Sequence, residues 1–134
     1  MKEERRKHRR AADVFMVTYR LKSPFEVTVR TEEQDYAAVA MDIGEGGVGV
    51  NVDREISVGA QVRLQFRMFN EISASEKNRQ RAFDLDGESR HCRIVGEKNY
   101  HVGILFKNAS PEDRAFIASY VKDQALKKYF QSRS

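Results

Sequence analysis

Cysteine is almost absent from this sequence of 134 residues, and tryptophan is missing altogether. The single cysteine, Cys92, excludes a disulfide within the chain and any zinc site that needs several cysteines. A chain without disulfides suits a reducing compartment, so we expect it to reside in the cytoplasm. No apolar run approaches the roughly 18 residues that a membrane-spanning helix needs. The charged N-terminus also lacks the apolar stretch of a signal peptide, so we expect neither a membrane span nor secretion.

Signatures of enzymes are missing as well. The sequence contains no phosphate-binding P-loop, no nucleophile elbow and no His-Glu-x-x-His zinc motif. Its three histidines, His8, His91 and His101, are not spaced like metal ligands and do not accompany a cluster of carboxylates or cysteines. We therefore interpret them as surface or packing residues, and we expect no enzymatic activity, no metal and no cofactor.

Short segments in which apolar and polar residues alternate dominate the sequence beyond residue 13. The clearest runs from Val62 to Met68, where every second residue is apolar, as is typical of a half-buried strand. Other strands are expected at residues 14–21, 25–30, 36–43, 48–52, 83–95 and 100–106. Because no helix separates these strands, they favour an antiparallel sandwich or a small barrel.

Three details of this strand pattern lead to specific expectations. Residues 25–30 are the expected hairpin partner of residues 14–21, joined through Lys22-Ser23-Pro24. The polar residues 70–81 are expected to form a loop between two strands. Gly87, inside an expected strand, is interpreted as the mark of a bulge or bend.

The C-terminal part of the chain changes to a helical pattern. Ser110 is a suitable N-cap, Pro111 suits the first helical position, and the acidic Asp113 follows three residues after the cap. Apolar residues then recur at helical spacing from Phe116 to Ala125, so one face of the helix should pack on the barrel. We expect one domain over residues 1–134, divided into a basic arm at 1–12, a β-barrel at 13–107 and a C-terminal helix at 110–130.

The positive charge of the sequence is concentrated at its start. Six basic and two acidic residues lie among the first ten, so this arm accounts for the whole formal net charge of +4. Such an arm is either a solvated tail that binds polyanions without specificity, or one part of a specific site for an anion.

Two short elements are candidates for a binding site. Arg6 and Arg10 lie four residues apart in the basic arm, with Arg5 beside the first of them. Asp42 begins the sequence Asp-Ile-Gly-Glu-Gly-Gly, which ends at Gly47 between two expected strands. Each element is unspecific by itself, because the first spacing arises easily in a basic arm and the second has the composition of an ordinary β-turn.

Together, these elements resemble the PilZ family of cyclic di-GMP (c-di-GMP) receptors. That family combines an R-x-x-x-R element, just before the first barrel strand, with a [D/N]-x-S-x-x-G element at a corner between two strands. Here Arg6 and Arg10 match the first element, while Asp42 and Gly47 match the second. Gly44 stands where the family has serine. The succession of strands and the final helix also match, so the resemblance covers nearly the whole chain.

The resemblance implies a bacterial second-messenger receptor of mainly β structure. Its fold would be a small antiparallel barrel of about six strands with a C-terminal α-helix packed on it and a flexible basic N-terminal arm. The ligand would be c-di-GMP, and no metal site is implied. The ligand-binding residues that the resemblance implies are Arg5, Arg6, Arg10, Asp42, Gly44 and Gly47, with Arg9, Gly46 and Arg93 as further candidates.

The chemistry of c-di-GMP agrees with these residue types. Arginine pairs in a bidentate manner with phosphate oxygens or with O6 and N7 of guanine, and it stacks on purine faces. A carboxylate such as that of Asp42 accepts hydrogen bonds from N1–H and the exocyclic amine of guanine. Glycines allow backbone N–H groups to approach a ligand closely.

We expect c-di-GMP to dock at the corner from Asp42 to Gly47 and the arm to close over it, which would change the surface that a protein effector contacts. The sequence does not identify that effector. One alternative, kept open by Gly44, is a degenerate PilZ-like module that binds a protein but no nucleotide. A less favoured alternative is a small basic barrel that binds nucleic acid. Such barrels expose aromatic residues for base stacking, whereas Phe15, Tyr19 and Phe66 are expected in the core, so we expect no nucleic-acid partner.

Overall fold

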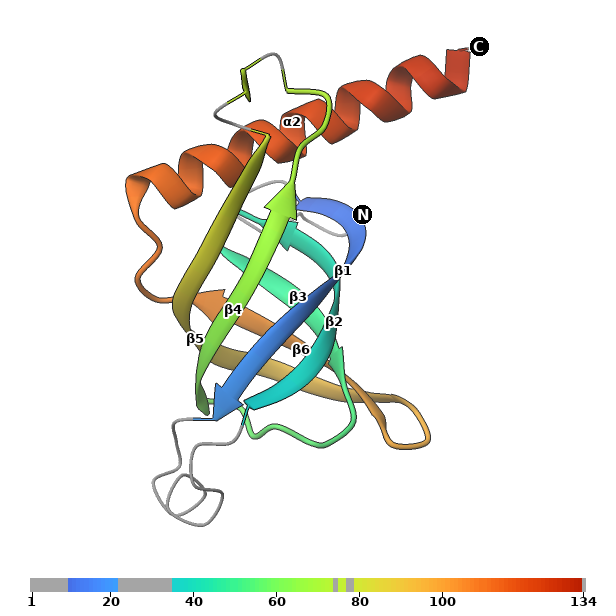
Figure 1. Ribbon diagram of the computed structural model, residues 1–134. Coiled ribbons are helices and arrows are strands. Elements are labelled where there is room, and N and C mark those ends of the chain that lie inside the picture. Colours follow the sequence, from blue (N-terminus) through green and yellow to red (C-terminus); the bar gives the residue numbers. More distant parts are fainter. Residues whose placement is uncertain (1–9, 22–34, 74, 77–78, 134) are drawn as a thin grey trace, which may run out of the picture.

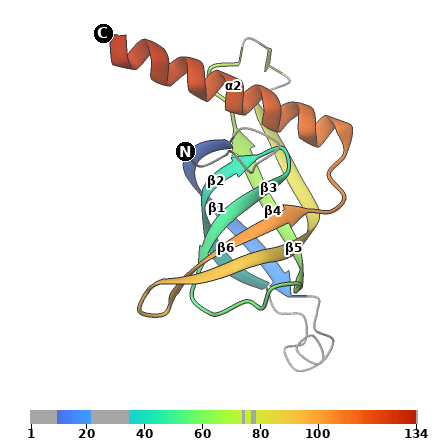
Figure 2. The same ribbon diagram turned by 180° about the vertical axis from the view of Figure 1, so that it is seen from behind.

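The protein is described by a computed structural model that covers residues 10–21, 35–73, 75–76 and 79–133. Six strands close into a barrel in the order β1-β2-β3-β6-β5-β4, and every neighbouring pair is antiparallel (Figure 1). The strands are β1 (Arg10–Leu21), β2 (Asp35–Gly44), β3 (Gly47–Val52), β4 (Gln61–Phe69), β5 (Gln80–Gly96) and β6 (Asn99–Phe106). A long helix, α2 (Pro111–Arg133), lies across one end of the barrel (Figure 2).

The alternation of apolar and polar residues explains which side chains fill the barrel. On β4, Val62, Leu64, Phe66 and Met68 are buried, and the residues between them face outward. Inside the barrel the ring of Phe66 stacks on that of Phe83, with 4.7 Å between their centroids. The inward side chains are buried and pack into one hydrophobic core, which fills the interior of the barrel.

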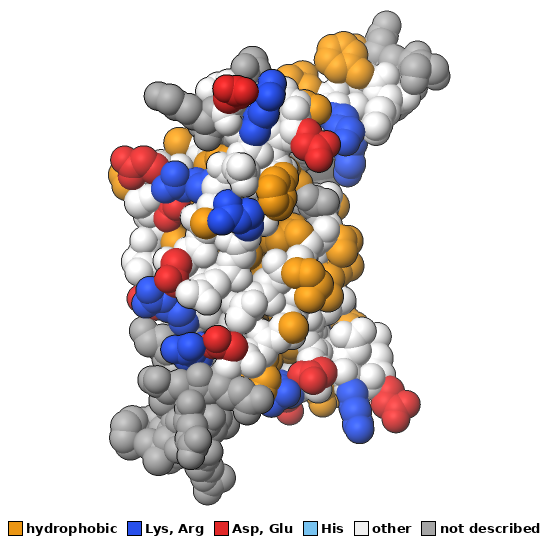
Figure 3. Space-filling model, in the orientation of Figure 1, with side chains coloured by type: hydrophobic (Ala, Val, Ile, Leu, Met, Phe, Trp, Pro, Cys, Tyr) orange, Lys and Arg blue, Asp and Glu red, His pale blue; other side chains and the backbone are white. Residues whose placement is uncertain are grey.

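The outer surface differs from one side of the barrel to another. Acidic and basic side chains lie together over β4 and β5, whereas apolar side chains gather over β1 and β2 (Figure 3). Arg63 and Asp84 are one of the exposed ion pairs on the charged side, with 2.5 Å between Nε and Oδ1. Val14 and Met16 of β1 are among the exposed apolar residues.

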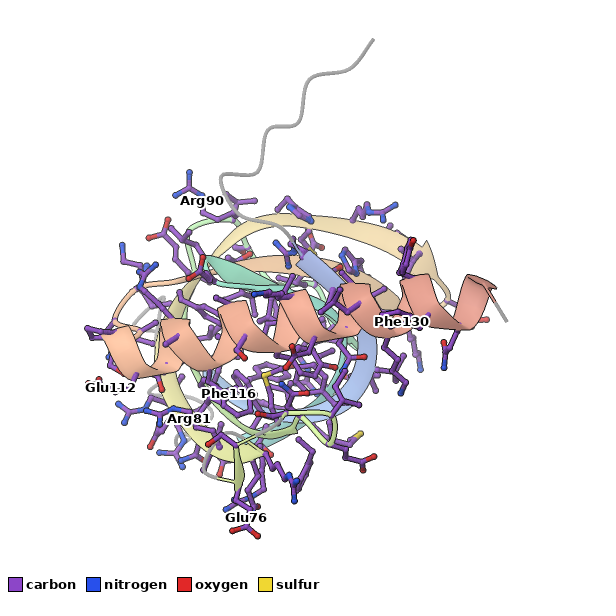
Figure 4. The ribbon with its side chains drawn as sticks, turned by 90° about the horizontal axis from the view of Figure 1, so that it is seen from above. Glu76, Arg81, Arg90, Glu112, Phe116 and Phe130 are labelled. Atoms are coloured by element: carbon purple, nitrogen blue, oxygen red, sulfur yellow. The ribbon has the colours of Figure 1, made fainter. Side chains whose placement is uncertain are left out.

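The helix begins with reciprocal hydrogen bonds at its N-terminus. The backbone N–H of Asp113 donates to Ser110 Oγ at 3.0 Å, and the backbone N–H of Ser110 donates to Asp113 Oδ2 at 3.1 Å. Arg81 of β5 adds an ion pair to Asp113, with 2.9 Å between Nε and Oδ1. Seen from above, α2 crosses the end of the barrel (Figure 4). Phe116 lies over the barrel, and Phe130 lies toward the C-terminal end of the helix. Phe116 packs edge-on against Phe83, so the helix closes the core.

These observations confirm the predicted small antiparallel barrel with a C-terminal helix packed on it. The expected strand at residues 25–30 and the basic arm before Arg10 lie outside the described residues. The expected pairing of residues 25–30 with residues 14–21 is wrong, because β1 pairs with β2 on one edge and with β4 on the other. The arm was expected to extend to residue 12, but β1 begins at Arg10, because Arg10 and Ala11 pair with the backbone of Gly44 and Ile43. That residues 1–134 form a single domain stays a prediction.

Of the bulge or bend expected at Gly87, the bulge is wrong, because Gly87 pairs in register with Val62 of β4 and Phe106 of β6. The register of β5 against β6 shifts instead between Ser89 and His91. A Cβ on Gly87 would lie 2.5 Å from Cγ2 of Ile104, so this glycine leaves room for an apolar neighbour in the core. Of the described helices, none combines the length and the apolar character needed to cross a bilayer.

Candidate functional site

Arg10 and Asp42 form an ion pair on the outer surface of the barrel. Arg10 begins β1 and lies opposite Gly44, while Asp42 lies two residues earlier on β2. Nη2 of Arg10 contacts Oδ1 of Asp42, and the two side chains are only 19% and 23% exposed. Partial burial strengthens such a pair relative to one that is fully solvated. The arginine motif and the glycine-rich motif of the sequence therefore meet in the structure, through Arg10 of the first and Asp42 of the second.

The corner between β2 and β3 is a tight turn. Gly44 and Gly47 are the last paired residues of the two strands, and Glu45 and Gly46 form the turn between them. The carbonyl of Gly46 accepts a hydrogen bond from the backbone N–H of Phe106 at 2.9 Å, which fixes the turn against the end of β6. A Cβ on Gly47 would overlap the carbonyl oxygen of Ile104. The last glycine of the motif thus allows close packing of β3 on β6.

Beyond Asp42, the outer face continues across β3 and β6 to β5. Gly49 of β3 pairs with Asp42 on one side and with Gly103 of β6 on the other. His101 lies opposite Asn51, and its Nδ1 is 2.8 Å from Oδ1 of that residue. The ring of His91 stacks on that of His101, with 5.8 Å between centroids and 29° between planes. Asp42 therefore lies at one edge of a polar surface that contains two imidazoles.

Burial lowers the pKa of His101 below its ordinary value. The positive charge of Arg93 acts in the same direction, Asp42 opposes it, and His91 and Arg10 lower this pKa further. His101 is therefore a neutral imidazole at pH 7.

Most of the predicted site residues lie around this corner, but the arm residues cannot be placed. Arg10, Asp42, Gly44, Gly46 and Gly47 come together at the ends of β1, β2 and β3. Arg5, Arg6 and Arg9 lie outside the described residues, and their roles stay predictions.

Arg93, a further candidate for ligand binding, is exposed and lies on β5 opposite His101, and its role stays a prediction. Its neighbour Cys92 lies opposite Val102 and packs partly buried against the core.

Sequence reasoning missed the contributions of Asn51, His91 and His101 to this surface. We interpreted the two histidines as surface or packing residues, and nothing in their local sequence sets them apart. The sequence pattern could indicate only that these side chains point outward from their strands. Which strands lie beside Asp42 depends on the closure of the barrel. Within the described residues, no group of three or more His, Cys, Asp or Glu side chains is arranged to hold a metal ion.

The sequence of the chain matches the model of a known protein family. The model of the PilZ domain matches residues 4–123, which is most of the chain and includes both motifs. The chain belongs to the PilZ domain family. Members of this family are receptors and adaptors, which agrees with the interpretation of the chain as a binding module rather than an enzyme.

Solved structures of other PilZ proteins share the fold. The inhibitor of motility MotI from Bacillus subtilis superimposes with a TM-score of 0.70 at 18% identity, over 94% of this chain and 54% of MotI. The c-di-GMP complex of MrkH from K. pneumonia gives 0.63 at 15% identity, over 96% of this chain and 56% of MrkH. The PilZ domain of YcgR from Escherichia coli with c-di-GMP gives 0.59 at 12% identity, over 97% of each chain.

The chain thus spans about half the length of MotI and MrkH, and nearly all of the isolated PilZ domain of YcgR. No curated protein sequence matches the chain. At these identities the structures show a common fold.

Proposed function

We propose that this PilZ domain is a c-di-GMP receptor whose ligand binds at the corner formed by Arg10, Asp42 and the glycines between β2 and β3. The ion pair of Arg10 with Asp42 is the observation that carries this function. It holds a guanidinium and a carboxylate side by side, partly buried, on the outer face of the barrel. The c-di-GMP complexes of MrkH and of the YcgR PilZ domain support the choice of ligand, because both proteins share this fold.

The two charged groups recognise different parts of such a ligand. The planar fork of Arg10 pairs with a phosphate or with O6 and N7 of guanine, and the carboxylate of Asp42 accepts from guanine N–H groups. Gly46 and Gly47 add backbone groups without a side chain in the way. Arg5, Arg6 and Arg9 on the arm supply further positive charge for the second phosphate and base.

We further propose that ligand binding rearranges the arm and thereby changes the affinity for a protein effector. Six basic residues lie within ten positions of the arm and start of β1, so their mutual repulsion favours an anion between them. Closing the arm over a bound dinucleotide would then alter the surface next to the corner, as in other switches that order a segment on ligand binding.

Calorimetric titration with c-di-GMP tests the receptor function directly. We expect saturable binding with a dissociation constant of about micromolar or lower. GMP and a short single-stranded RNA are the controls, and neither should bind comparably. The absence of heat at tens of micromolar protein would contradict the proposal and favour a PilZ-like module that recognises only proteins. Binding of the RNA alone would favour the nucleic-acid alternative.

Replacement of Gly44 by serine is expected to raise the affinity for c-di-GMP about two- to tenfold. The new hydroxyl would add one hydrogen bond at the corner, which is worth about 0.5–1.5 kcal/mol. The backbone tolerates the change, because Gly59 is the only described glycine with a positive φ. The same titration measures the effect, and Gly96→Ser in the β5–β6 hairpin is the matched control. Unchanged or weaker binding of Gly44→Ser would show that no ligand atom lies within reach of this position.

A further inference from the structure

The polar surface next to Asp42 contains a second hydrogen-bond acceptor that the sequence motifs do not include. Gly49 lies between Asp42 and His101, and the side chains of these two residues lie over its backbone, in the place that a Cβ would need. A Cβ built on Gly49 would lie 2.9 Å from Oδ2 of Asp42 and 3.1 Å from Nε2 of His101. Both atoms therefore lie close to one point above the backbone of β3.

Asn51 determines which nitrogen of His101 carries the hydrogen. Nδ1 lies 2.8 Å from Oδ1 of Asn51, and a carboxamide oxygen only accepts hydrogen bonds. In the neutral ring Nδ1–H is therefore the donor, and Nε2 carries the lone pair on the ring edge that lies beside Gly49. The ring of His91 stacks on His101 and restricts its rotation. Asn51 therefore makes Nε2 of His101 the acceptor of the ring, and His91 packs against the ring and limits its rotation.

Two neighbouring acceptors select a ligand edge that carries two adjacent donors. Oδ1 of Asp42 is engaged by Arg10, so Oδ2 and Nε2 of His101 are the acceptors that lie over Gly49. Guanine presents N1–H and the exocyclic N2 amine side by side. Adenine presents one amine next to an acceptor nitrogen, and hypoxanthine lacks the N2 amine. The pair of acceptors therefore matches guanine and neither of the other two purines.

We propose that His101 is a specificity-determining residue of this site, which accepts a hydrogen bond from the exocyclic amine of guanine through Nε2 while Asp42 accepts from N1–H. The assignment rests on the proposed function, because it names the part of c-di-GMP that this surface reads. Asn51 and His91 are positioning residues that hold the imidazole in the accepting tautomer and in its plane.

The role of His101 makes binding depend on pH in one direction. Protonation converts Nε2 from an acceptor to a donor, which then opposes the guanine amine. The titratable and charged groups that face the ring are Arg93 and His91 of β5, Arg10 of β1 and Asp42 of β2, and burial, followed by the charge of Arg93, lowers the pKa of His101. Affinity is therefore constant at neutral pH and falls as the pH drops through the pKa of His101, by at most about tenfold per pH unit.

The test compares c-di-GMP with its inosine analogue, cyclic di-IMP, which lacks only the two exocyclic amines. Titrations of the full chain use both ligands at several pH values between 5 and 8. The wild-type protein should prefer c-di-GMP by about tenfold at pH 7 and lose that preference at low pH. His101→Ala should reduce this preference to about twofold and remove the pH dependence. His101→Gln, whose amide oxygen accepts without titrating, should keep the preference and lose the pH dependence.

Gln65→Ala is the matched control, because Gln65 is an exposed polar residue on the outer face of β4. Thermal unfolding of each variant verifies that it is folded. If wild type binds c-di-GMP and His101→Ala keeps both the preference and the pH profile, the role of His101 is wrong and the receptor function stands. If wild type binds neither dinucleotide, the receptor function is wrong, and the role of His101 falls with it.

Discussion

Replacement of Arg10 by alanine is expected to lower the affinity for c-di-GMP by about 100-fold. Each hydrogen bond to a charged group contributes about 1.5–3 kcal/mol, so the loss of one such contact corresponds to roughly 10- to 150-fold. The change also leaves the carboxylate of Asp42 partly buried without its cation, next to the phosphates of the ligand. Repulsion between these negative charges adds to the loss. Calorimetric titration of the purified variant measures the effect.

Arg63→Ala is the matched control for this experiment. Arg63 also forms an ion pair with an aspartate on the outer face of the barrel, Asp84, but it lies opposite Arg20, near the end of β1 that is remote from Arg10. Its removal should leave the affinity for c-di-GMP unchanged, because Arg63 lies away from the proposed site. The variant should also remain folded, because exposed ion pairs contribute only about 0–1 kcal/mol to stability.

Arg10→Lys separates charge from geometry at the same position. Lysine keeps the charge but not the planar fork, so we expect an affinity between those of wild type and Arg10→Ala. If Arg10→Ala binds c-di-GMP as tightly as wild type does, the ligand does not bind at this corner.

Replacement of Gly47 by alanine is expected to destabilise the barrel by about 3 kcal/mol. The added Cβ would overlap the carbonyl oxygen of Ile104, which belongs to the backbone of β6 and cannot rotate away. Overpacking of this kind typically costs about 1–3 kcal/mol, and a rigid neighbour places it at the upper end. For a chain of this size the midpoint of thermal unfolding should fall by about 10 °C. Unfolding followed by circular dichroism measures both quantities.

Gly96→Ala provides the comparison for Gly47→Ala. A Cβ on Gly96 would lie 3.5 Å from Cβ of Asn99, which is an ordinary van der Waals contact. The stability of this variant should therefore lie within about 0.5 kcal/mol of wild type. If both variants unfold at the same temperature as wild type, β3 does not pack against β6 as closely as the structure shows. The last glycine of the motif would then have no structural role.

Local features of the sequence were sufficient to predict the elements of the fold. The alternation from Val62 to Met68 defines β4, because a strand places successive side chains on opposite faces and only one face is buried. Ser110 and Asp113 define the start of α2, because their side chains reach backbone N–H groups within one turn. Family motifs identified Arg10 and Asp42, and these two residues form an ion pair.

The second half of the candidate site depends on contacts between strands far apart in the sequence. Asp42 lies beside Gly49, and Gly49 lies beside Gly103, only because β3 pairs with β2 on one side and β6 on the other. The alternation of apolar and polar residues indicates that His101 faces outward. The same alternation would fit any strand partner, so it does not show which strand lies beside His101. The choice of partner follows from closure of the whole barrel and the packing of its interior. The sequence by itself therefore determined the strands, the helix and the identity of Arg10 and Asp42 as site residues. Only the tertiary structure joined these two residues in an ion pair and placed His101 and Asn51 beside Asp42.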